Sequence, residues 1–225
     1  MDMKKLAGDK AATYVKDGMV VGLGTGSTAY HMVNAVGEMV KNGLKIQAIP
    51  TSKATEAQAR ELGIPLLTID EVDHVDISID GVDEIDPQFN AIKGGGGALY
   101  REKVVATLAK EVIWIMDESK LVDKIGAFHL PVEIAQYGSK QAMAKMAEYG
   151  FNPVLRVRDG KTFVTDNGNF IADLHLGAGF DIQDVYSKLT GMLGVLEHGL
   201  FLNMCKRMIV GCASGEVKVI ENPTK

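Results

Sequence analysis

Two glycine-rich segments each connect a β-rich run to a helical pattern. The first is Gly22-Leu-Gly-Thr-Gly-Ser-Thr-Ala29, which joins an expected strand at 19–23 to an expected helix at 28–41. The second is the four-glycine run at 94–97, which precedes an expected helix at 98–110. Glycine allows the backbone to turn tightly, and a helix N-terminus presents N–H groups that bind anions. The two segments therefore predict strands that lead into helices through anion-binding turns.

The first half of the chain alternates between short β-rich runs and longer helical patterns. This alternation is typical of a parallel sheet covered by helices. We expect a helix after Thr51 or Ser52 that ends near Gly63. The other expected strands of this half lie at 44–49, 65–69, 75–79 and 112–116.

The pattern changes near Pro131 to hairpins and helices, which is typical of an antiparallel α+β unit. Its expected helices are 139–149, capped by Ser139, and 181–192; its expected strands are 153–158, 162–165, 170–174 and 195–201, with turns at Asp159-Gly160 and Asn167-Gly168. The last alternating runs, 207–210 and 217–220, should form a hairpin on the first sheet. The predicted fold class is therefore α/β. It has a Rossmann-like parallel-sheet catalytic domain at 1–129 and 203–225, and an inserted smaller α+β domain, an antiparallel sheet plus two helices, at 130–202.

The charge balance argues against a nucleic-acid partner. The chain has 29 acidic and 24 basic residues, a net charge of −5 and no basic run, whereas polyanions are normally met by a basic surface. A small anion bound locally is compatible with this balance.

No apolar stretch approaches the roughly 20 residues that span a bilayer, and the N-terminus lacks the apolar core of a secretory signal. We therefore expect a cytoplasmic protein with no membrane partner.

Cysteine and histidine spacing gives no indication of a metal or redox site. Cys205 and Cys212 lie in an apolar segment without the close spacing of a zinc or redox pair, so we expect ordinary buried thiols. The five histidines are dispersed along the chain and show no ligand spacing. We expect no bound metal.

The first glycine segment fits a single phosphate better than a dinucleotide. Gly22-x-Gly24-x-Gly26 resembles a dinucleotide fingerprint, but its third glycine comes one residue early and Ser27 holds the required position. A dinucleotide site also needs an acid near the end of the second strand, where this chain reads Gln47-Ala-Ile-Pro-Thr-Ser52. Thr25, Ser27 and Thr28 instead suit a phosphate at a helix N-terminus. A tight turn without a ligand is the alternative.

Four carboxylates crowd the segment Asp80-Gly-Val-Asp-Glu-Ile-Asp86. Apolar residues alternate with polar ones just before it, so the carboxylates should leave the carboxyl end of a strand, where open α/β sheets bind ligands. Mutual repulsion would favour a proton on one of them and suit an acid or a proton shuttle. A calcium or magnesium site is an alternative, although the spacing does not match an EF-hand and a nearby lysine would oppose a cation. A solvated acidic turn is another.

Three motifs follow one another between residues 24 and 103. They are Gly-Thr-Gly-Ser-Thr at 24–28, Asp-Gly-x-Asp-Glu at 80–84, and Lys-Gly-Gly-Gly with Arg-Glu-Lys at 93–103. In this order the set resembles ribose-5-phosphate isomerase of the A type. The resemblance covers nearly the whole chain and includes Thr51-Ser52, Ser119-Lys120, Pro131-Val-Glu133, Thr165-Asp-Asn-Gly168 and Gly199-Leu-Phe201.

The resemblance implies an aldose-ketose isomerase without a metal or organic cofactor. It would interconvert D-ribose 5-phosphate and D-ribulose 5-phosphate through a cis-enediolate, in the non-oxidative pentose phosphate pathway. By spacing alone Glu102 is an ordinary solvated charge, but by resemblance it is the base that moves a proton between C2 and C1. Asp80 would assist ring opening and move protons between O1 and O2. The donors to the enediolate would be Lys93 and the backbone N–H groups of Gly94, Gly95 and Gly96.

The same resemblance assigns the substrate contacts. Asp83 would bind sugar hydroxyls, and Gly81 belongs to the same substrate-binding motif. The phosphate would be bound by Thr25, Gly26, Ser27 and Thr28, with Lys4 and Lys120 as cationic partners and Lys5 as the alternative to Lys4. The family tends to form homodimers or homotetramers. The chain departs from the family pattern at Leu202-Asn-Met-Cys-Lys-Arg207, which concerns packing more than the reaction.

Two other functions stay open on sequence grounds. A non-catalytic sensor on the same fold would bind the sugar phosphate and leave its C2 proton unexchanged. A nucleotide- or coenzyme-A-dependent enzyme would use the glycine loop for a different ligand.

Overall fold

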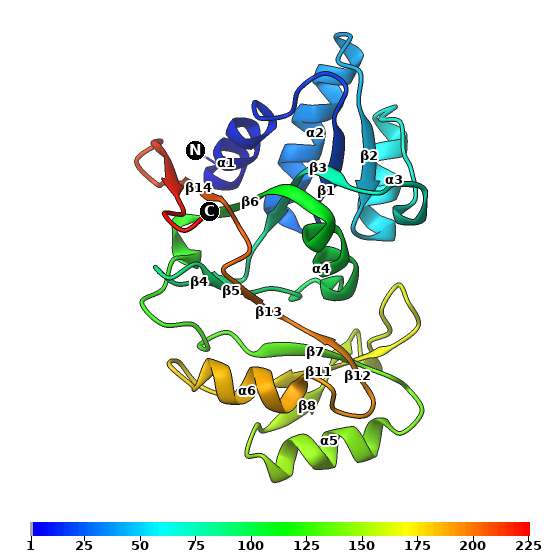
Figure 1. Cartoon of the computed structure of the whole chain (residues 1–225), viewed down its shortest axis with the longest axis vertical. Coiled ribbons are helices and arrows are strands. Elements are labelled where there is room, and N and C mark those ends of the chain that lie inside the picture. Colours follow the sequence, from blue (N-terminus) through cyan, green and yellow to red (C-terminus); the bar gives the residue numbers. More distant parts are fainter. Residues whose placement is uncertain (1) are drawn as a thin grey trace. The chain divides into compact units, whose positions relative to one another are not determined.

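The structure is a computed structural model that describes residues 2–225 (Figure 1). The chain divides into two compact units. The first comprises residues up to Val82, Arg101–Lys120 and Met204–Lys225, and the second comprises Asp83–Tyr100 and Leu121–Asn203. Helices cover a mainly parallel sheet in the first unit, and antiparallel sheets dominate the second, so the predicted α/β class is confirmed.

The first unit is built on a six-stranded sheet. Its neighbouring strands are parallel except at one edge, where the last two strands form an antiparallel hairpin. This hairpin confirms the prediction that the C-terminal runs return to the first sheet. In spatial order the strands are β15 (Val217–Glu221), β14 (Arg207–Gly211), β6 (Ala109–Asp117), β3 (Val75–Gly81), β1 (Val20–Leu23) and β2 (Gln47–Pro50).

Helices pack on both faces of this sheet. They are α1 (Met3–Ala12), α2 (Ser27–Lys41), α3 (Lys53–Glu61) and α4 (Leu99–Leu108), with short 3-10 turns η1 (Ile69–Glu71) and η2 (Glu118–Lys120). Helix α4 begins in the second unit and belongs to the first from Arg101 onward. Ser52 caps α3 as predicted, because its Oγ atom accepts the Thr55 N–H at 3.1 Å.

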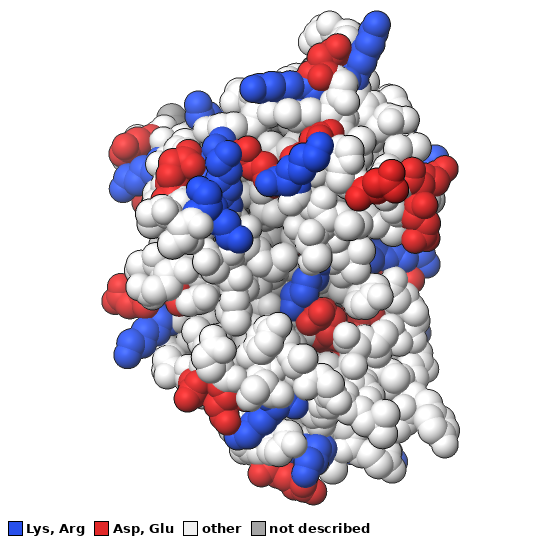
Figure 2. Space-filling view, viewed as in Figure 1, with Lys and Arg blue, Asp and Glu red and all other residues white. Residues whose placement is uncertain are grey.

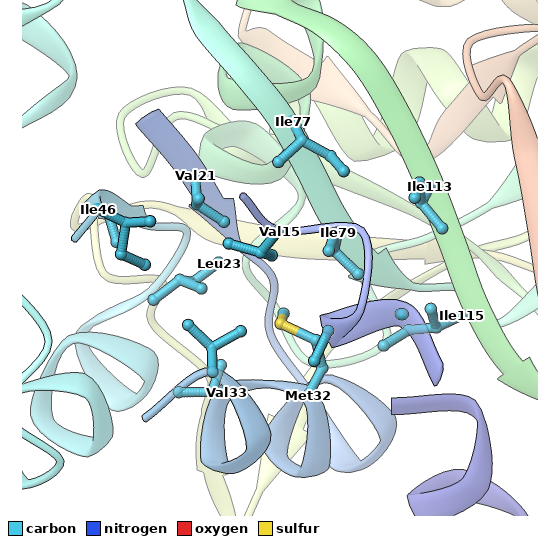
Figure 3. Packing of buried hydrophobic residues seen from close by; sticks show 14 of the residues in the cluster. Val15, Val21, Leu23, Met32, Val33, Ile46, Ile77, Ile79, Ile113 and Ile115 are labelled. Carbon is cyan, nitrogen blue, oxygen red and sulfur yellow. The ribbon is translucent and has the colours of Figure 1, made fainter. Parts of the chain in front are cut away.

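Strand alternation separates two layers of side chains on the parallel sheet. Val21 and Leu23 of β1 and Ile77 and Ile79 of β3 point toward α1 and α2, where Figure 3 shows them packed with residues such as Met32. The opposite face carries Gly22 and Ser78. A Cβ atom on Gly22 would lie 2.5 Å from Val105 Cγ1 and 3.1 Å from Ser78 Oγ, so α4 packs closely over this second face.

The second unit has two antiparallel sheets and a hairpin. The four-stranded sheet runs β12 (Val195–His198), β7 (Leu130–Ile134), β11 (Phe170–Leu174) and β8 (Pro153–Leu155), and the three-stranded sheet runs β13 (Leu200–Leu202), β5 (Asn90–Ile92) and β4 (Glu84–Ile85). The hairpin pairs β9 (Val157–Arg158) with β10 (Lys161–Thr162) through Asp159-Gly160. Helices α5 (Ser139–Glu148) and α6 (Ile182–Leu189) contribute Met146, Val185 and Leu189 to a core with β7 and β11.

Several predicted details are wrong for local reasons. The expected strand at 65–69 is reduced to a single parallel bridge between Ala48 and Leu66, because the chain turns into η1 at Ile69. Gly138 rather than Ser139 is the N-cap of α5, and its φ of 79° is a left-handed conformation that glycine adopts easily. The Asn167-Gly168 turn does not join paired strands, since β11 pairs with β7 and β8 instead.

Two further differences are a helix that was not predicted and an expected strand that is divided. Helix α1 was not predicted, because its buried residues are small, Ala7, Gly8, Ala11 and Ala12, and give no strong apolar stripe. The expected strand at 195–201 divides at Gly199, whose N–H donates to Pro131 O at 2.8 Å and whose carbonyl accepts the Lys93 N–H at 2.9 Å. The residues 83–100 group with the second unit, since β5 pairs with β13. The predicted division into a catalytic domain at 1–129 and 203–225 and an inserted α+β domain at 130–202 stays a prediction.

Charged side chains are interspersed over the face of the molecule that Figure 2 shows, with lysine and arginine beside aspartate and glutamate. No helix within residues 2–225 combines the length and the apolar character needed to cross a bilayer. The two cysteines, Cys205 and Cys212, are buried free thiols, as predicted from their apolar segment.

Candidate active site

The carboxyl ends of β1 and β3 meet at the point where the strand order reverses. Strand β2 lies on one side of β1 and β3 lies on the other, so the chain leaves β1 and β3 in different directions. In open α/β sheets this switch point is where ligands bind. The loop that begins at Gly24 and the carboxylate of Asp80 both lie there.

Asp80 is held by the backbone of the two strand ends. Its Oδ1 atom accepts the Thr25 N–H at 2.9 Å and the Gly81 N–H at 2.7 Å, and the side chain is 1% exposed. The Gly24 N–H donates to Ile79 O at 2.9 Å, which ties the glycine loop to β3. Asp80 is the penultimate residue of β3, at the carboxyl end of a strand as predicted. The sheet therefore fixes the position of this carboxylate directly.

A group of hydroxyls anchors the side chain of Thr25. The Thr25 Oγ1 atom lies 2.7 Å from Thr51 Oγ1, 2.9 Å from Ser52 Oγ and 3.2 Å from Thr55 Oγ1. Thr55 Oγ1 in turn donates to Gly24 O at 2.9 Å. The turn after β1 is thus joined to the N-terminus of α3, and Thr25 is oriented by three neighbours.

The N-terminus of α2 is open to solvent at Gly26 and Ser27 and buried at Thr28. Gly26 is the N-cap with a φ of 108°, and it has no side chain to cap the first N–H groups. These N–H groups and the helix dipole favour an anion. Figure 1 shows α2 rising directly from the end of β1.

Lys4, and not Lys5, is the lysine at this turn. The Lys4 Nζ atom donates to Ser27 Oγ at 3.0 Å, whereas Lys5 forms an ion pair with Asp9 of its own helix. Lys120 ends η2, which follows β6 at the same edge of the sheet, and its side chain is half-buried. The first unit thus brings Lys4, Thr25, Ser27 and Asp80 to the carboxyl edge of its sheet.

Glu102 is buried in α4, with 4% exposure, although it stands between Arg101 and Lys103. Carboxylates are almost never fully buried unless they are paired. Glu102 precedes Val105 by three residues and therefore lies on the same side of the helix, which packs on the sheet at Gly22 and Ser78. Asp80 points to the same face as Ser78, two residues earlier in β3. Two carboxylates, Asp80 and Glu102, therefore share one face of the first unit's sheet.

Lys93 is a buried lysine of the second unit, directly after β5. It is 2% exposed, and its Nζ atom lies 5.2 Å from the centre of the Phe201 ring. Its backbone N–H donates to Gly199 O, where β12 and β13 separate. The ammonium group of a lysine in such surroundings is kept away from bulk water. Its interaction with a negative charge is therefore stronger than it would be in water.

The glycine run beside Lys93 is closely packed against Asp83. The Gly95 N–H donates to Asp83 Oδ2 at 2.8 Å, and a Cβ atom on Gly95 would lie 2.6 Å from Asp83 Oδ1. The Asp83 N–H donates to Ile92 O at 2.9 Å, which fixes Asp83 to β5. Gly94 and Gly97 adopt positive φ values of 101° and 88°. Glycine at 94 and 97 allows the turn, and glycine at 95 allows the approach of the Asp83 carboxylate.

The other two carboxylates of the acidic segment support loops. Glu84 accepts the N–H groups of Gly126 and Phe128, both at 2.7 Å. Asp86 accepts the N–H groups of Gln88 and Asn90 at 3.0 and 2.9 Å. Among residues 2–225 no three histidine, cysteine, aspartate or glutamate side chains come together to hold a metal ion. Asp80 and Asp83 therefore remain the candidates of this segment for chemistry.

Sequence reasoning missed Arg156, which contacts the glycine run, and Asp173, which pairs with Arg156. Arg156 follows β8 in an apolar context, and Asp173 lies inside β11. A single charged residue in an otherwise apolar strand is the available signal, since such residues are seldom buried without a partner. It does not say what the partner is.

Comparison with known proteins places this fold among sugar-phosphate isomerases. Residues 47–215 match the family described as Ribose 5-phosphate isomerase A (phosphoriboisomerase A). The chain is 54% identical over 221 residues to Ribose-5-phosphate isomerase A of Streptococcus gordonii, with 98% of both chains covered. The ribose 5-phosphate isomerase A structure from Methanocaldococcus jannaschii has a TM-score of 0.91 and 37% identity, with 98% of each chain covered. A structure of D-ribose-5-phosphate isomerase in complex with phospho-erythronic acid has a TM-score of 0.92 and 37% identity, covering 98% of this chain and 100% of that one.

Proposed function

Because the chain belongs to the ribose 5-phosphate isomerase A family and is an isomerase of ribose 5-phosphate, we propose that its reaction runs through a cis-enediolate with Glu102 as the base. The observation that carries this proposal is the burial of Glu102 on the face of the sheet that also carries Asp80. A carboxylate withheld from water suits the removal of a proton from carbon near neutral pH. The pathway we propose is the non-oxidative pentose phosphate pathway.

Glu102 removes the C2 proton of the open-chain aldose and returns a proton to C1. The electrons of the C2–H bond form the C1–C2 double bond, and negative charge develops on oxygen. Asp80 assists ring opening and carries a proton between O1 and O2, so that the carbonyl moves from C1 to C2. Two backbone N–H bonds keep Asp80 in place for this task. Positioned acid–base catalysis of this kind contributes about 10²–10⁴-fold to the rate.

The negative oxygen needs donors that are already oriented. We assign this role to Lys93 and to the N–H groups of Gly94, Gly95 and Gly96. The burial of Lys93 supports the assignment, because a poorly solvated ammonium stabilises developing charge strongly. Asp83 and Gly81 then contact the sugar.

The phosphate is assigned to the turn that starts α2. Thr25, Gly26, Ser27 and Thr28 provide hydroxyls and N–H groups, and Lys4 provides a cation at Ser27. Lys120 is the second proposed cation. We also propose a cytoplasmic homodimer or homotetramer that needs no cofactor.

Solvent-deuterium exchange tests the proposal. The protein is incubated with ribose 5-phosphate in deuterated water, and label at C2 and ketose formation are measured together. The wild-type protein should show both, whereas Glu102→Gln should lose most of both and still bind the substrate in a thermal-shift assay. Near-normal turnover by Glu102→Gln would show that Glu102 is not the base. A wild-type protein that binds the sugar phosphate without exchange would be a sensor.

A further inference from the structure

Arg156 is a buried arginine that contacts two carbonyl oxygens of the glycine run. Its Nη1 atom donates to Gly94 O at 2.9 Å and to Gly95 O at 3.1 Å, and the residue is 8% exposed. The arginine lies 61 residues or more from both glycines in sequence. A planar guanidinium with donors in fixed directions can hold two neighbouring carbonyls at once.

The other side of this guanidinium is fixed by Asp173. The Arg156 Nε atom donates to Asp173 Oδ2 at 2.9 Å, and Nη2 donates to Asp173 Oδ1. Such a bidentate pair fixes orientation as well as charge. Asp173 lies in β11, between β7 and β8, so the arginine is supported by a regular sheet. The carbonyls of the glycine run are thus tied to the most regular part of the second unit.

The direction of the peptide groups follows from this contact. A trans peptide is planar, and its C=O points opposite to the following N–H. Because Gly94 O faces Arg156, the Gly95 N–H points away from it, and this N–H indeed meets Asp83 Oδ2 at 2.8 Å. Because Gly95 O also faces Arg156, the Gly96 N–H points away from Arg156 as well. Arg156 and Asp83 thus hold the first glycines from opposite sides.

We propose that Arg156 is a positioning residue that fixes the Gly94 and Gly95 carbonyls and thereby orients the Gly96 N–H for the reaction. The inference rests on the proposed function, in which the Gly96 N–H serves the enediolate, while the Gly95 N–H is held by Asp83 Oδ2 at 2.8 Å. Four consecutive glycines have wide conformational freedom, so their N–H groups need an external constraint to stay oriented. Donors that are oriented beforehand stabilise a transition state more than donors that must reorganise. Arg156 touches no reacting atom in this scheme and acts through the loop.

The test compares Arg156→Lys with Arg158→Lys in the full-length protein. Lysine keeps the charge but cannot hold two carbonyls and a carboxylate in one plane. Arg158 is a matched control, because it lies two residues on, is exposed, and stacks on Phe163 at 4.4 Å from the ring centre. The measurements are kcat and KM for ribose 5-phosphate, the thermal midpoint, and the inhibition constant of phospho-erythronic acid.

Arg156→Lys should lower kcat about 10²-fold, in the range found for loss of an oxyanion donor, and leave KM within about twofold. Inhibition by phospho-erythronic acid should weaken more than KM rises, because its carboxylate carries negative charge on oxygen, as the enediolate does. Arg158→Lys should change none of these values by more than about twofold. A merely structural role would lower the thermal midpoint and leave the kcat of the folded protein unchanged.

Asp173→Asn is the second variant, and it keeps the test decisive if Arg156→Lys does not fold. The amide keeps the shape of the side chain but presents only one acceptor oxygen to the guanidinium. A smaller kcat loss of about tenfold at unchanged KM is expected, because Arg156 stays in place with a looser orientation. Wild-type kcat in Asp173→Asn or in Arg156→Lys would overturn the inference. A wild-type protein that fails to isomerise ribose 5-phosphate would instead overturn the proposed function.

Discussion

Gly24 lies so close to Asp80 that a Cβ atom on Gly24 would come within 2.2 Å of Asp80 Oδ1 and 2.5 Å of Asp80 Cα. The contact follows from the sheet, because β1 and β3 are parallel neighbours with Leu23 opposite Ile79. The residues that follow these two, Gly24 and Asp80, therefore lie side by side. A glycine is required at 24 for a packing reason, beyond the needs of the turn.

Gly24→Ala should damage the site more than the fold. The added methyl group must push Asp80 away from its two N–H donors, so we expect kcat to fall at least about tenfold. The free energy of unfolding should fall by about 1–3 kcal/mol, as for other overpacked positions. Steady-state kinetics and urea unfolding measure the two effects.

Gly37→Ala provides the control for that substitution. A Cβ atom on Gly37 would lie 2.9 Å from Leu62 Cβ, away from the strand ends. It should lose stability in a similar range and keep its kcat. Equal kcat losses in the two variants would show that packing stress alone, and not the position of Asp80, lowers the rate.

The local pattern predicted the turn after β1, because glycine, hydroxyl and helix signals are adjacent in sequence. It could not choose between Lys4 and Lys5, since the choice depends on the rotation of α1 about its axis. That helix has only small buried residues, so its orientation is set by close packing such as that at Gly8, where an added Cβ atom would lie 2.7 Å from Met32 N. Tertiary packing supplied this information.

Glu102 and Arg156 illustrate the other limit of sequence reasoning. The neighbours Arg101 and Lys103 suggest an exposed glutamate, and only the packing of α4 on the sheet shows that Glu102 is buried. Arg156 meets Gly94 across 62 residues of chain. Such long-range pairs depend on which strands pair, and β-strand pairing is not encoded in local spacing.

Lys4→Met should weaken substrate binding, whereas Lys5→Met should not. Lys4 reaches Ser27 at the α2 N-terminus, and Lys5 is engaged with Asp9. Loss of a hydrogen bond to a charged group costs about 1.5–3 kcal/mol, so KM for ribose 5-phosphate should rise about tenfold or more in Lys4→Met. Initial-rate measurements over a range of ribose 5-phosphate concentrations give KM for both variants. Equal KM values in both variants would place Lys4 outside the phosphate contacts.

Stability should fall as the pH drops through the range in which His129 titrates. Burial lowers the pKa of His129 below its ordinary value of 6.5, and the positive charge of Arg156 adds to this, although Asp173 opposes it. The unfolded chain then binds a proton near pH 6.5, before the folded protein does, so protonation favours unfolding. The loss begins just below pH 6.5 and levels off once the pH has passed the lowered folded-state pKa.

Urea unfolding of the wild type and of His129→Gln between pH 7.5 and pH 5 measures this effect. Glutamine does not titrate, so the variant should lose less stability than the wild type over the window. The groups around His129 include Asp173, Arg156, His175 and Asp83, and all of them remain in the variant. Parallel curves for the two proteins would contradict the role of His129.

Lys93→Met should separate charge stabilisation from folding. Methionine has a similar length and an apolar character that suits the buried position beside Phe201, so the protein should fold with little loss of stability. The ammonium that we assign to the enediolate is lost, and kcat should fall by about 10²–10³-fold. KM should change little, because the neutral sugar of the ground state gains less from the charge. Lys140→Met, on the exposed surface of α5, is the control and should match the wild type. A Lys93→Met protein with near wild-type kcat would show that the lysine serves the packing of the second unit and not the reaction.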